Sequence, residues 1–221
     1  MHTAADSIDI AFTHPVDVRI QPPAGERNRL TTAFRLLLVI PHAILVGAPV
    51  AVASWSGWRV GVEWSSSGGG LLGLVAGVCA LIAWFSILFT GEHPEGLRRL
   101  ATFYLQWRVR AWAYASLLRD EYPPFGDGPY PAELVAGEPP AHRDRLSVAF
   151  RVILAIPHFV ALAVLGVVWC VATVIAWLAI LLTGRYPDAL YAFSVGMLRW
   201  NVRVEAYMLL LHDEYPPFSL E

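Results

Sequence analysis

The stretch that decides the fold runs from Arg29 to His42 and reads RLTTAFRLLLVIPH. The same pattern returns from Arg145 to His158 as RLSVAFRVILAIPH. In both copies an Arg-Leu opening motif leads into an apolar run that contains a Pro-His pair, and an apolar run of this kind is typical of the start of a membrane helix. The sequence therefore predicts a tandem duplication in which each repeat begins with a membrane helix.

The composition of the whole chain favours a membrane protein. Of its 221 residues, 56% are hydrophobic and 15% are charged, and the mean hydropathy is +0.50. Soluble domains are usually less apolar and carry about 25% charged residues. The first 30 residues are polar and proline-rich and lack the apolar core of a signal peptide, so we expect the first apolar run to direct the chain to the membrane.

Apolar segments in both repeats approach the length of a membrane span. In repeat one they cover residues 36–55 and 71–89, and in repeat two one apolar run covers residues 152–182. A span needs about 20 residues to cross about 30 Å of hydrocarbon. We therefore predict two helical hairpins with four spans in total, the second hairpin turning tightly at Gly166.

Repeat one is longer than repeat two because of an insertion. Arg145 follows Arg29 by 116 residues, but Trp177 follows Trp84 by only 93. Repeat one therefore contains 23 extra residues, which fall in the Trp-, Ser- and Gly-rich stretch between its two apolar segments. This composition is typical of an interfacial loop.

A third segment follows each hairpin, at residues 94–119 and 187–212, and carries arginines near its middle. Each arginine at the centre of a bilayer costs about 2.5–3.5 kcal/mol, so we predict an amphipathic helix that lies in the membrane interface. One face of each helix could bind anionic lipid headgroups or simply anchor the helix. The face residues are Trp107, Arg110 and Tyr114 in repeat one and Trp200, Arg203 and Tyr207 in repeat two.

The charge distribution predicts which side of the membrane each part faces. Arginines accumulate on the cytoplasmic side, so we expect both opening motifs, both third helices and both termini in the cytoplasm, with parallel repeats in the cell inner membrane. Short strands are possible at residues 15–20 and 131–135. The chain then divides into three parts, a polar tail (1–13), repeat one (14–125) and repeat two (126–221).

Each repeat closes with the same six residues, Asp-Glu-Tyr-Pro-Pro-Phe, at positions 120–125 and 213–218. Together with the opening motif, the Ile-Pro-His triplet, the Trp and Thr-Gly that end the second apolar segment and the Trp-x-x-Arg of the third helix, this ending resembles a bacterial membrane family described as domain of unknown function 4389. The resemblance covers about residues 15–218, as two tandem copies. It implies a membrane protein and assigns no activity or catalytic residue.

His42 and His158 are the ionisable groups that stand out within apolar sequence. Each follows a proline, and Arg35 or Arg151 lies seven residues earlier on the same helical face. A proton or metal site is one interpretation. The other is structural, because a proline removes a helix hydrogen bond and the adjacent histidine can satisfy the freed backbone or a neighbouring helix. No second His or Cys stands three or four residues away, so we expect no metal.

Acidic pairs stand at the end of each third segment, where carboxylates oppose the helix dipole. They are Asp120 with Glu121 and Asp213 with Glu214. We expect them to pair with arginines of the opening motifs and so to clamp the third helix to the first. The arginines considered are Arg29, Arg35, Arg145 and Arg151. An acid/base or metal-binding carboxylate pair is the alternative.

The sequence contains none of the common nucleophile, metalloprotease or phosphate-binding motifs. We therefore expect a non-enzymatic integral membrane protein without a cofactor, an accessory or scaffold protein that contacts lipids and a protein partner or a second copy of itself. No compact basic domain suggests nucleic acid. A small transporter or lipid-handling protein is the alternative, and an enzyme acting on lipid is a third hypothesis. Convergence of Arg35, His42, Arg151 and His158 on one cavity would favour the alternatives.

Overall fold

The computed structural model describes residues 14–23, 25, 27–47, 69–137 and 143–221. Most of these residues are helical, which confirms the predicted all-α class, and two short strands form a small sheet in addition. The predicted polar tail and most of the insertion in repeat one lie outside the described residues. In chain order the elements are β1 (Val16–Ile20), α1 (Arg29–Ala33), α2 (Arg35–Val46), α4 (Gly70–Thr90), α5 (Glu95–Ala115), β2 (Ala132–Ala136), α6 (Arg145–Thr183) and α7 (Asp188–Met208).

The pairing of the two strands reveals how the repeats are related. β1 and β2 are antiparallel, and Val18 lies opposite Leu134. These two residues are 116 positions apart, which is also the offset between the opening motifs, so each is the counterpart of the other. Equivalent residues that face each other place a pseudo-twofold axis through the centre of the sheet.

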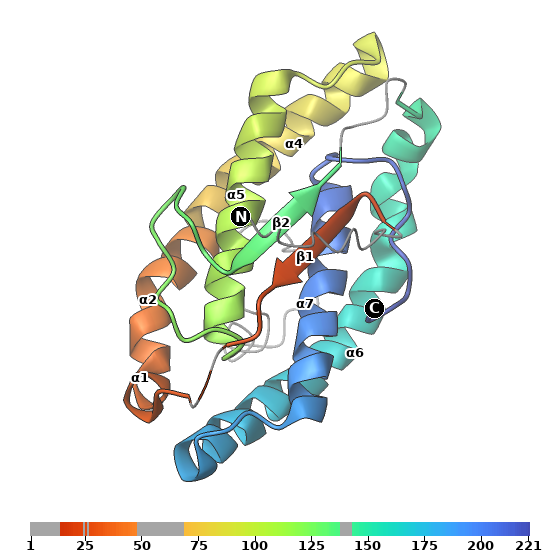
Figure 1. Cartoon of the computed structure of the whole chain (residues 1–221). Helices are drawn as coiled ribbons and strands as arrows, with labels where there is room; N and C mark the ends of the chain where they lie inside the picture. Colours follow the sequence, from red (N-terminus) through yellow and green to blue (C-terminus); the bar gives the residue numbers. More distant parts are fainter. Residues whose placement is uncertain (1–13, 24, 26, 48–68, 138–142) are drawn as a thin grey trace, which may run out of the picture.

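The same pseudo-twofold axis relates the long helices of the two repeats, which run antiparallel (Figure 1). Trp84 Nε1, near the end of α4, donates to the Val148 carbonyl at the start of α6 over 2.8 Å. Its counterpart Trp177 Nε1, near the end of α6, donates to the Thr32 carbonyl in α1 over 2.9 Å. The opening motifs therefore lie at opposite ends of the molecule. The predicted parallel arrangement is wrong, because the repeats associate by exchanging equivalent contacts across a twofold axis.

α6 is one continuous helix of 39 residues, so the predicted turn at Gly166 and the second hairpin are wrong. A glycine inside a helix costs about 1 kcal/mol relative to alanine. A turn at this point would instead leave several backbone groups without helical partners in an apolar environment. The continuous helix is therefore the less costly arrangement of this apolar run.

Repeat one follows the same path with a break in the middle. α2 ends at Val46, the counterpart of Leu162, and α4 begins at Gly70, the counterpart of Ala163. The broken ends stay together, because a Cβ atom on Gly70 would lie 2.6 Å from the carbonyl carbon of Leu45. All 23 extra residues are thus inserted at one position of a long helix. They separate two halves of one helix and not two membrane spans.

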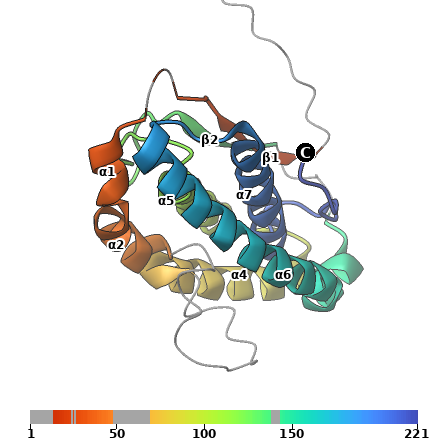
Figure 2. The ribbon, with the colours of Figure 1, turned by 90° about the horizontal axis from the view of Figure 1, so that it is seen from below.

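α5 and α7 form the middle of three layers, between the sheet and the long helices (Figure 2). α5 packs on β2, α7 packs on β1, and the two helices contact each other. On their other side, α5 packs on α2 and α4, and α7 packs on α6. The predicted interfacial position of these helices is wrong, because their aromatic and arginine side chains are turned into the protein core.

Candidate functional site

An arginine clamp joins the first helix of repeat one to the end of its third helix. Arg35 Nη1 donates to the carbonyls of Tyr114 and Arg119 over 3.2 and 2.6 Å, and Nη2 lies 2.7 Å from Asp120 Oδ1. The guanidinium carbon lies 4.1 Å from the centre of the Tyr114 ring. Arg35 is only 2% exposed, so its charge is balanced within the protein.

Repeat two contains the same clamp at equivalent positions. Arg151 Nη1 donates to the carbonyls of Tyr207 and His212 over 2.8 and 3.0 Å, and Nη2 lies 2.7 Å from Asp213 Oδ1. Its guanidinium carbon lies 4.2 Å from the centre of the Tyr207 ring. Both repeats thus form every contact of the clamp, and the clamp is a defining feature of the repeat.

Each clamp secures an unusual backbone turn after the third helix. Leu117 and Leu210 have φ angles of +64° and +62°, a left-handed conformation that is unfavourable for leucine. A second arginine, Arg27 or Arg143, donates to the carbonyl of that leucine. It also lies 3.3 or 3.4 Å from the clamped aspartate. The two arginines of each clamp therefore satisfy carbonyls that the end of a helix leaves free.

Within the acidic pairs, the aspartates and the glutamates have different environments. The two aspartates lie in the clamps, whereas Glu121 pairs with its neighbour Arg119 and Glu214 is exposed. The glutamates are therefore outside the contact between the first and third helices. Acid/base chemistry is not favoured by this geometry, because arginines bind the aspartate oxygens.

Two of the arginines considered as partners of these acids contact the opposite repeat instead. The Arg29 guanidinium lies beside Gly184, the C-cap of α6, and the Arg145 guanidinium lies beside Gly91, the C-cap of α4. Both glycines have positive φ angles, +74° and +84°, which glycine adopts without strain. An arginine at a helix C-terminus also complements the helix dipole. These two arginines therefore help to join the repeats end to end.

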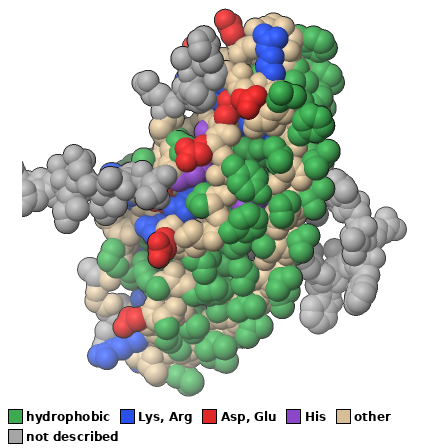
Figure 3. All heavy atoms as spheres, turned by 90° about the vertical axis from the view of Figure 1, so that its right-hand side faces the viewer, with side chains coloured by type: hydrophobic (Ala, Val, Ile, Leu, Met, Phe, Trp, Pro, Cys, Tyr) green, Lys and Arg blue, Asp and Glu red, His purple; other side chains and the backbone are tan. Residues whose placement is uncertain are grey.

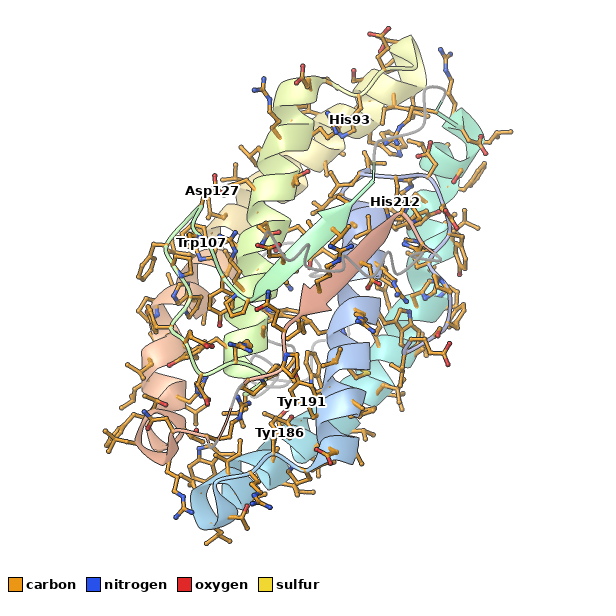
Figure 4. All side chains as sticks on the ribbon, viewed as in Figure 1. His93, Trp107, Asp127, Tyr186, Tyr191 and His212 are labelled. Carbon is orange, nitrogen blue, oxygen red and sulfur yellow. The ribbon has the colours of Figure 1, made fainter. Side chains whose placement is uncertain are left out.

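The Pro-His pair of repeat one lies in a closed aromatic cluster. His42 Nδ1 accepts a hydrogen bond from Trp107 Nε1 over 3.0 Å. The His42 ring stacks on Phe125 of the Tyr-Pro-Pro-Phe ending, with ring centres 4.5 Å apart. Trp107 comes from α5 and lies on the α2 side of the molecule, away from His212 (Figure 4). Three distant parts of the repeat thus meet around one fully buried histidine.

The Pro-His pair of repeat two has equivalent neighbours. His158 Nδ1 accepts from Trp200 Nε1 over 3.2 Å, and its ring stacks on Phe218 with centres 4.0 Å apart. A donor aimed at Nδ1 holds each imidazole with its proton on Nε2. Because each histidine contacts residues of its own repeat, the two histidines and the two clamp arginines do not converge on one site. This geometry favours the structural interpretation of the Pro-His pairs.

The six residues predicted to face lipid headgroups are all buried, so that prediction is wrong. A spacing of three and four residues marks a helix face turned toward a core as well as one turned toward a membrane interface, and it could not separate the two cases. The exposed fractions are 8% for Trp107, 7% for Arg110, 1% for Tyr114, 4% for Trp200, 2% for Arg203 and 1% for Tyr207.

The two arginines of this set have different partners. Arg203 lies 3.3 Å from Asp17 Oδ1 in β1. Arg110 instead donates to the Gly126 carbonyl over 2.8 Å. The counterpart of Asp17 in β2 is Glu133, which is exposed. Both arginines thus fasten the third helix to structure on the sheet side, by an ion pair in one repeat and by a carbonyl in the other.

A buried polar cluster lies between α5 and α7 and was not predicted from the sequence. Arg108 Nε lies 2.9 Å from Glu205 Oε2, and the Tyr104 hydroxyl donates to Glu205 Oε1 over 2.9 Å. Burial raises the pKa of Glu205, and the Arg108 charge and the Tyr104 bond oppose that rise. The sequence does indicate that the repeats differ at this place, because Met197 and Asn201 occupy the positions equivalent to Tyr104 and Arg108.

This cluster satisfies the broken end of α2. Arg108 Nη1 donates to the Val46 carbonyl over 3.0 Å, and Trp112 Nε1 donates to the Gly47 carbonyl over 3.2 Å. Val46 is the last residue of α2 and Gly47 is its C-cap, and unpaired carbonyls at a helix end inside the protein are costly. The middle layer therefore supplies the hydrogen bonds that the interrupted helix has lost.

The outer side of α2, α4 and α6 exposes a continuous set of large hydrophobic side chains, which we call the apolar face. Figure 3 shows apolar side chains over the side of the molecule away from the sheet, whereas charged side chains gather on the opposite side and at the ends. Members of the apolar face include Ile44, Val78, Phe85, Val160, Val171 and Leu182. An exposed apolar patch of this extent marks an interaction surface.

Two helices of the apolar face are long and apolar enough to cross a membrane. α4 has 21 residues and a mean hydropathy of 2.5, and α6 has 39 residues and a mean hydropathy of 2.7. α2 has 12 residues and is too short. The described residues thus contain two candidate spans where the sequence predicts four, because the second hairpin is one helix and the first is a broken one.

These features define a class of helical proteins in which two clamped repeats exchange contacts about a pseudo-twofold axis and share one apolar face. The family described as "Domain of unknown function (DUF4389)" matches residues 69–126 and 145–219. The chain belongs to this family, with one copy in each repeat, which confirms the predicted resemblance. The first match begins at the end of the insertion, one residue before α4. Comparison with curated proteins and with solved structures gave no match.

Proposed function

We propose that this protein is a non-enzymatic accessory or scaffold protein of the cell inner membrane, bound to lipid through its apolar face. The observation that carries the proposal is the continuous apolar face of α2, α4 and α6, opposite a polar side that contains the sheet. Water contact with so much apolar surface is unfavourable, at about 25 cal/mol per Å². A lipid environment removes this contact and leaves the polar side free for a protein partner or a second copy.

The contacts of the buried polar groups support a structural role for these groups. The clamp arginines and aspartates bind each other and the ends of α5 and α7. The Pro-His pairs bind tryptophans of their own repeats, and the Arg108 cluster binds the end of α2. These groups therefore act on the fold itself, and no observation of the described residues favours the transporter or lipid-handling alternative.

The proposal is tested by flotation of the purified full chain with neutral phosphatidylcholine vesicles. Val78 and Val171 are equivalent residues on the apolar face, 52% and 54% exposed. The double variant Val78→Asp/Val171→Asp should lower the vesicle-bound fraction about tenfold or more, because charge in the apolar layer is costly.

The matched control is the double variant Gln21→Asp/Ala136→Asp, which adds the same charge at exposed positions on the sheet side. It should float as well as the original protein. Equal binding of both double variants, or failure of the original protein to float, would contradict the proposal.

A further inference from the structure

We propose that the chain lies in one leaflet of a phospholipid bilayer, with α4 and α6 parallel to the membrane plane, and does not cross the membrane. This inference rests on the proposed membrane association and specifies its geometry. It follows from the length of α6, from the layers that cover its inner side and from the charges at both ends of the long helices.

The length of α6 does not fit an upright span. Its 39 residues extend about 58 Å at 1.5 Å per residue, whereas the hydrocarbon core is about 30 Å thick. Exposed apolar side chains occupy both ends of the helix, with Leu146 at 71%, Phe150 at 54% and Leu182 at 77%. An upright helix would hold one or both of these ends in water, whereas a helix in the membrane plane buries the whole row.

The layers on the inner side of α6 also disfavour crossing. α6 packs on α7, and α7 packs on β1, so any span made by α6 would carry the two-stranded sheet to the same depth. The sheet exposes the charged side chains of Arg19 and Glu133. Charged side chains are costly within the hydrocarbon region and rarely face lipid there. An orientation in the membrane plane keeps this side in water.

Charged side chains lie at both ends of the apolar face. Arg29 is exposed at the start of α1 beside the end of α6, and Arg145 is exposed at the start of α6 beside the end of α4. Within α6 the only other charged residue is Arg151, which is buried, and α4 has none. Arginines that flank an uncharged apolar surface can reach lipid phosphates at both ends.

A bilayer fits this surface better than a second copy of the chain. Protein interfaces are mixed, and even the cores of homodimer interfaces are only about 65% apolar. The outer sides of α4 and α6 are uninterrupted by exposed charge, and the hydropathy of both helices reaches that of membrane spans. The occupant of the apolar face is therefore the acyl layer of one leaflet.

The test uses two equivalent positions at opposite ends of the long helices. Gly96 follows α4, Ala189 follows α6, and both are exposed in the first turn of the next helix. Each is changed to cysteine in a full chain in which Cys79→Ala and Cys170→Ala remove the native thiols. Bacterial membranes that contain each variant are prepared as right-side-out and as inverted vesicles and treated with a membrane-impermeant maleimide. Ala136→Cys on the exposed sheet side is the reference.

If the chain lies in one leaflet, Gly96→Cys, Ala189→Cys and Ala136→Cys are all labelled in the same vesicle preparation and are all protected in the other. Labelling of Gly96→Cys in one preparation and of Ala189→Cys in the other overturns the inference, because the helices then cross. Protection of either end in both preparations also overturns it. A chain that does not fractionate with membranes refutes the proposed membrane association itself, which separates the two failures.

Discussion

Repeat two builds its long helix without interruption, whereas repeat one builds the same helix from two pieces. α6 contains 39 residues in one run, and in repeat one the equivalent path ends at Val46 in α2 and resumes at Gly70 in α4. Both versions pack on the middle layer and contact the other repeat through equivalent tryptophan bonds. Backbone continuity is therefore not what holds the long helix in place. Packing on α5 and α7 holds it.

The interrupted helix requires polar groups that the continuous helix does not. The Val46 carbonyl accepts from Arg108, and in repeat two Asn201 occupies the equivalent position. Glu205, on the uninterrupted repeat, balances the Arg108 charge. The buried cluster is therefore linked to the insertion. Arg108 caps the interrupted helix, and Glu205 of the other repeat balances the Arg108 charge.

The largest predicted effect tests what the two repeats share. Arg35→Ala and Arg151→Ala should each lower the free energy of unfolding by about 3–5 kcal/mol, because each leaves a clamped aspartate and helix carbonyls without their main partner. The two losses should be similar, since the clamps have the same contacts. Both are measured by denaturant unfolding in one detergent, followed by tryptophan fluorescence.

Arg29→Ala serves as the control for the clamp variants. Arg29 is exposed and lies beside Gly184 of the other repeat, so its loss should have a much smaller effect than the loss of Arg35. A large effect of Arg35→Ala with a negligible effect of Arg151→Ala would show that the repeats are held differently.

The second prediction addresses the cluster that only repeat one requires. Glu205→Gln should lower the free energy of unfolding by about 2–3 kcal/mol, because hydrogen bonds to charged groups contribute about that much when buried. Combining it with Arg108→Asn, which copies the residue of repeat two, should cost less than the sum of the two single changes. Additive losses, measured by the same unfolding experiment, would mean that Arg108 and Glu205 do not depend on each other.

The sequence predicts the parts of this fold that depend on local pattern and repetition. The duplication, the helices and the position of the 23-residue insertion follow from residue matches at fixed offsets. The expected pairing of acids with arginines of the opening motifs agrees with the Asp120 contact to Arg35 and the Asp213 contact to Arg151. Opposite charges at repeated positions leave few other partners, and for this reason the pairing could be proposed without coordinates.

The parts that the sequence could not predict depend on which surface each helix meets. Gly166 indicated a turn, but a glycine inside a long apolar helix is tolerated and the helix continues. The faces that contain Trp107 and Trp200 match the pattern of an interfacial helix, yet they are buried. Periodicity identifies a face and not its environment. The parallel sense of the repeats was predicted from the arginine distribution and two spans per repeat, and the continuous α6 removes that pair of spans in repeat two.

The third prediction removes the difference between the repeats. Deleting residues 47–69 joins Val46 to Gly70 and, with Gly70→Ala, copies the junction of Leu162 and Ala163 in α6. The chain should keep its helical content and cooperative unfolding by circular dichroism. Its free energy of unfolding should fall by about 1–2 kcal/mol, because Trp112 loses the Gly47 carbonyl and is left as a buried donor.

A shorter deletion of residues 48–68 is the matched control. It leaves two extra residues in the helix and turns α4 by about 200° relative to α2, at 100° per residue. The apolar face of α4 would then point into the middle layer, and the variant should lose cooperative unfolding. If the shorter deletion folds as well as the longer one, the two repeats do not share the register inferred here.

The smallest predicted effect comes from a position where the repeats differ in charge. His212 stands where repeat one has Arg119. Burial, together with the neighbouring His14 and Arg151, lowers the pKa of His212 to about 3. The unfolded chain, with a histidine pKa of about 6.5, therefore binds more protons than the folded chain between these values. Stability from this group is complete above pH 6.5 and falls as the pH drops, by at most about 1.4 kcal/mol per pH unit.

His212→Gln removes this titration and should flatten the pH dependence. Between pH 7 and pH 5.5, the denaturation midpoint of the original chain should fall more than that of the variant. Arg119→Gln, at the equivalent position of repeat one, should leave the slope unchanged, because an arginine stays charged throughout this range. Burial also lowers the pKa of His14, whose ring centre lies 4.7 Å from that of His212, so the difference between the two chains reports this coupled pair. Equal slopes for the original chain and His212→Gln would mean that His212 is accessible to protons in the folded protein.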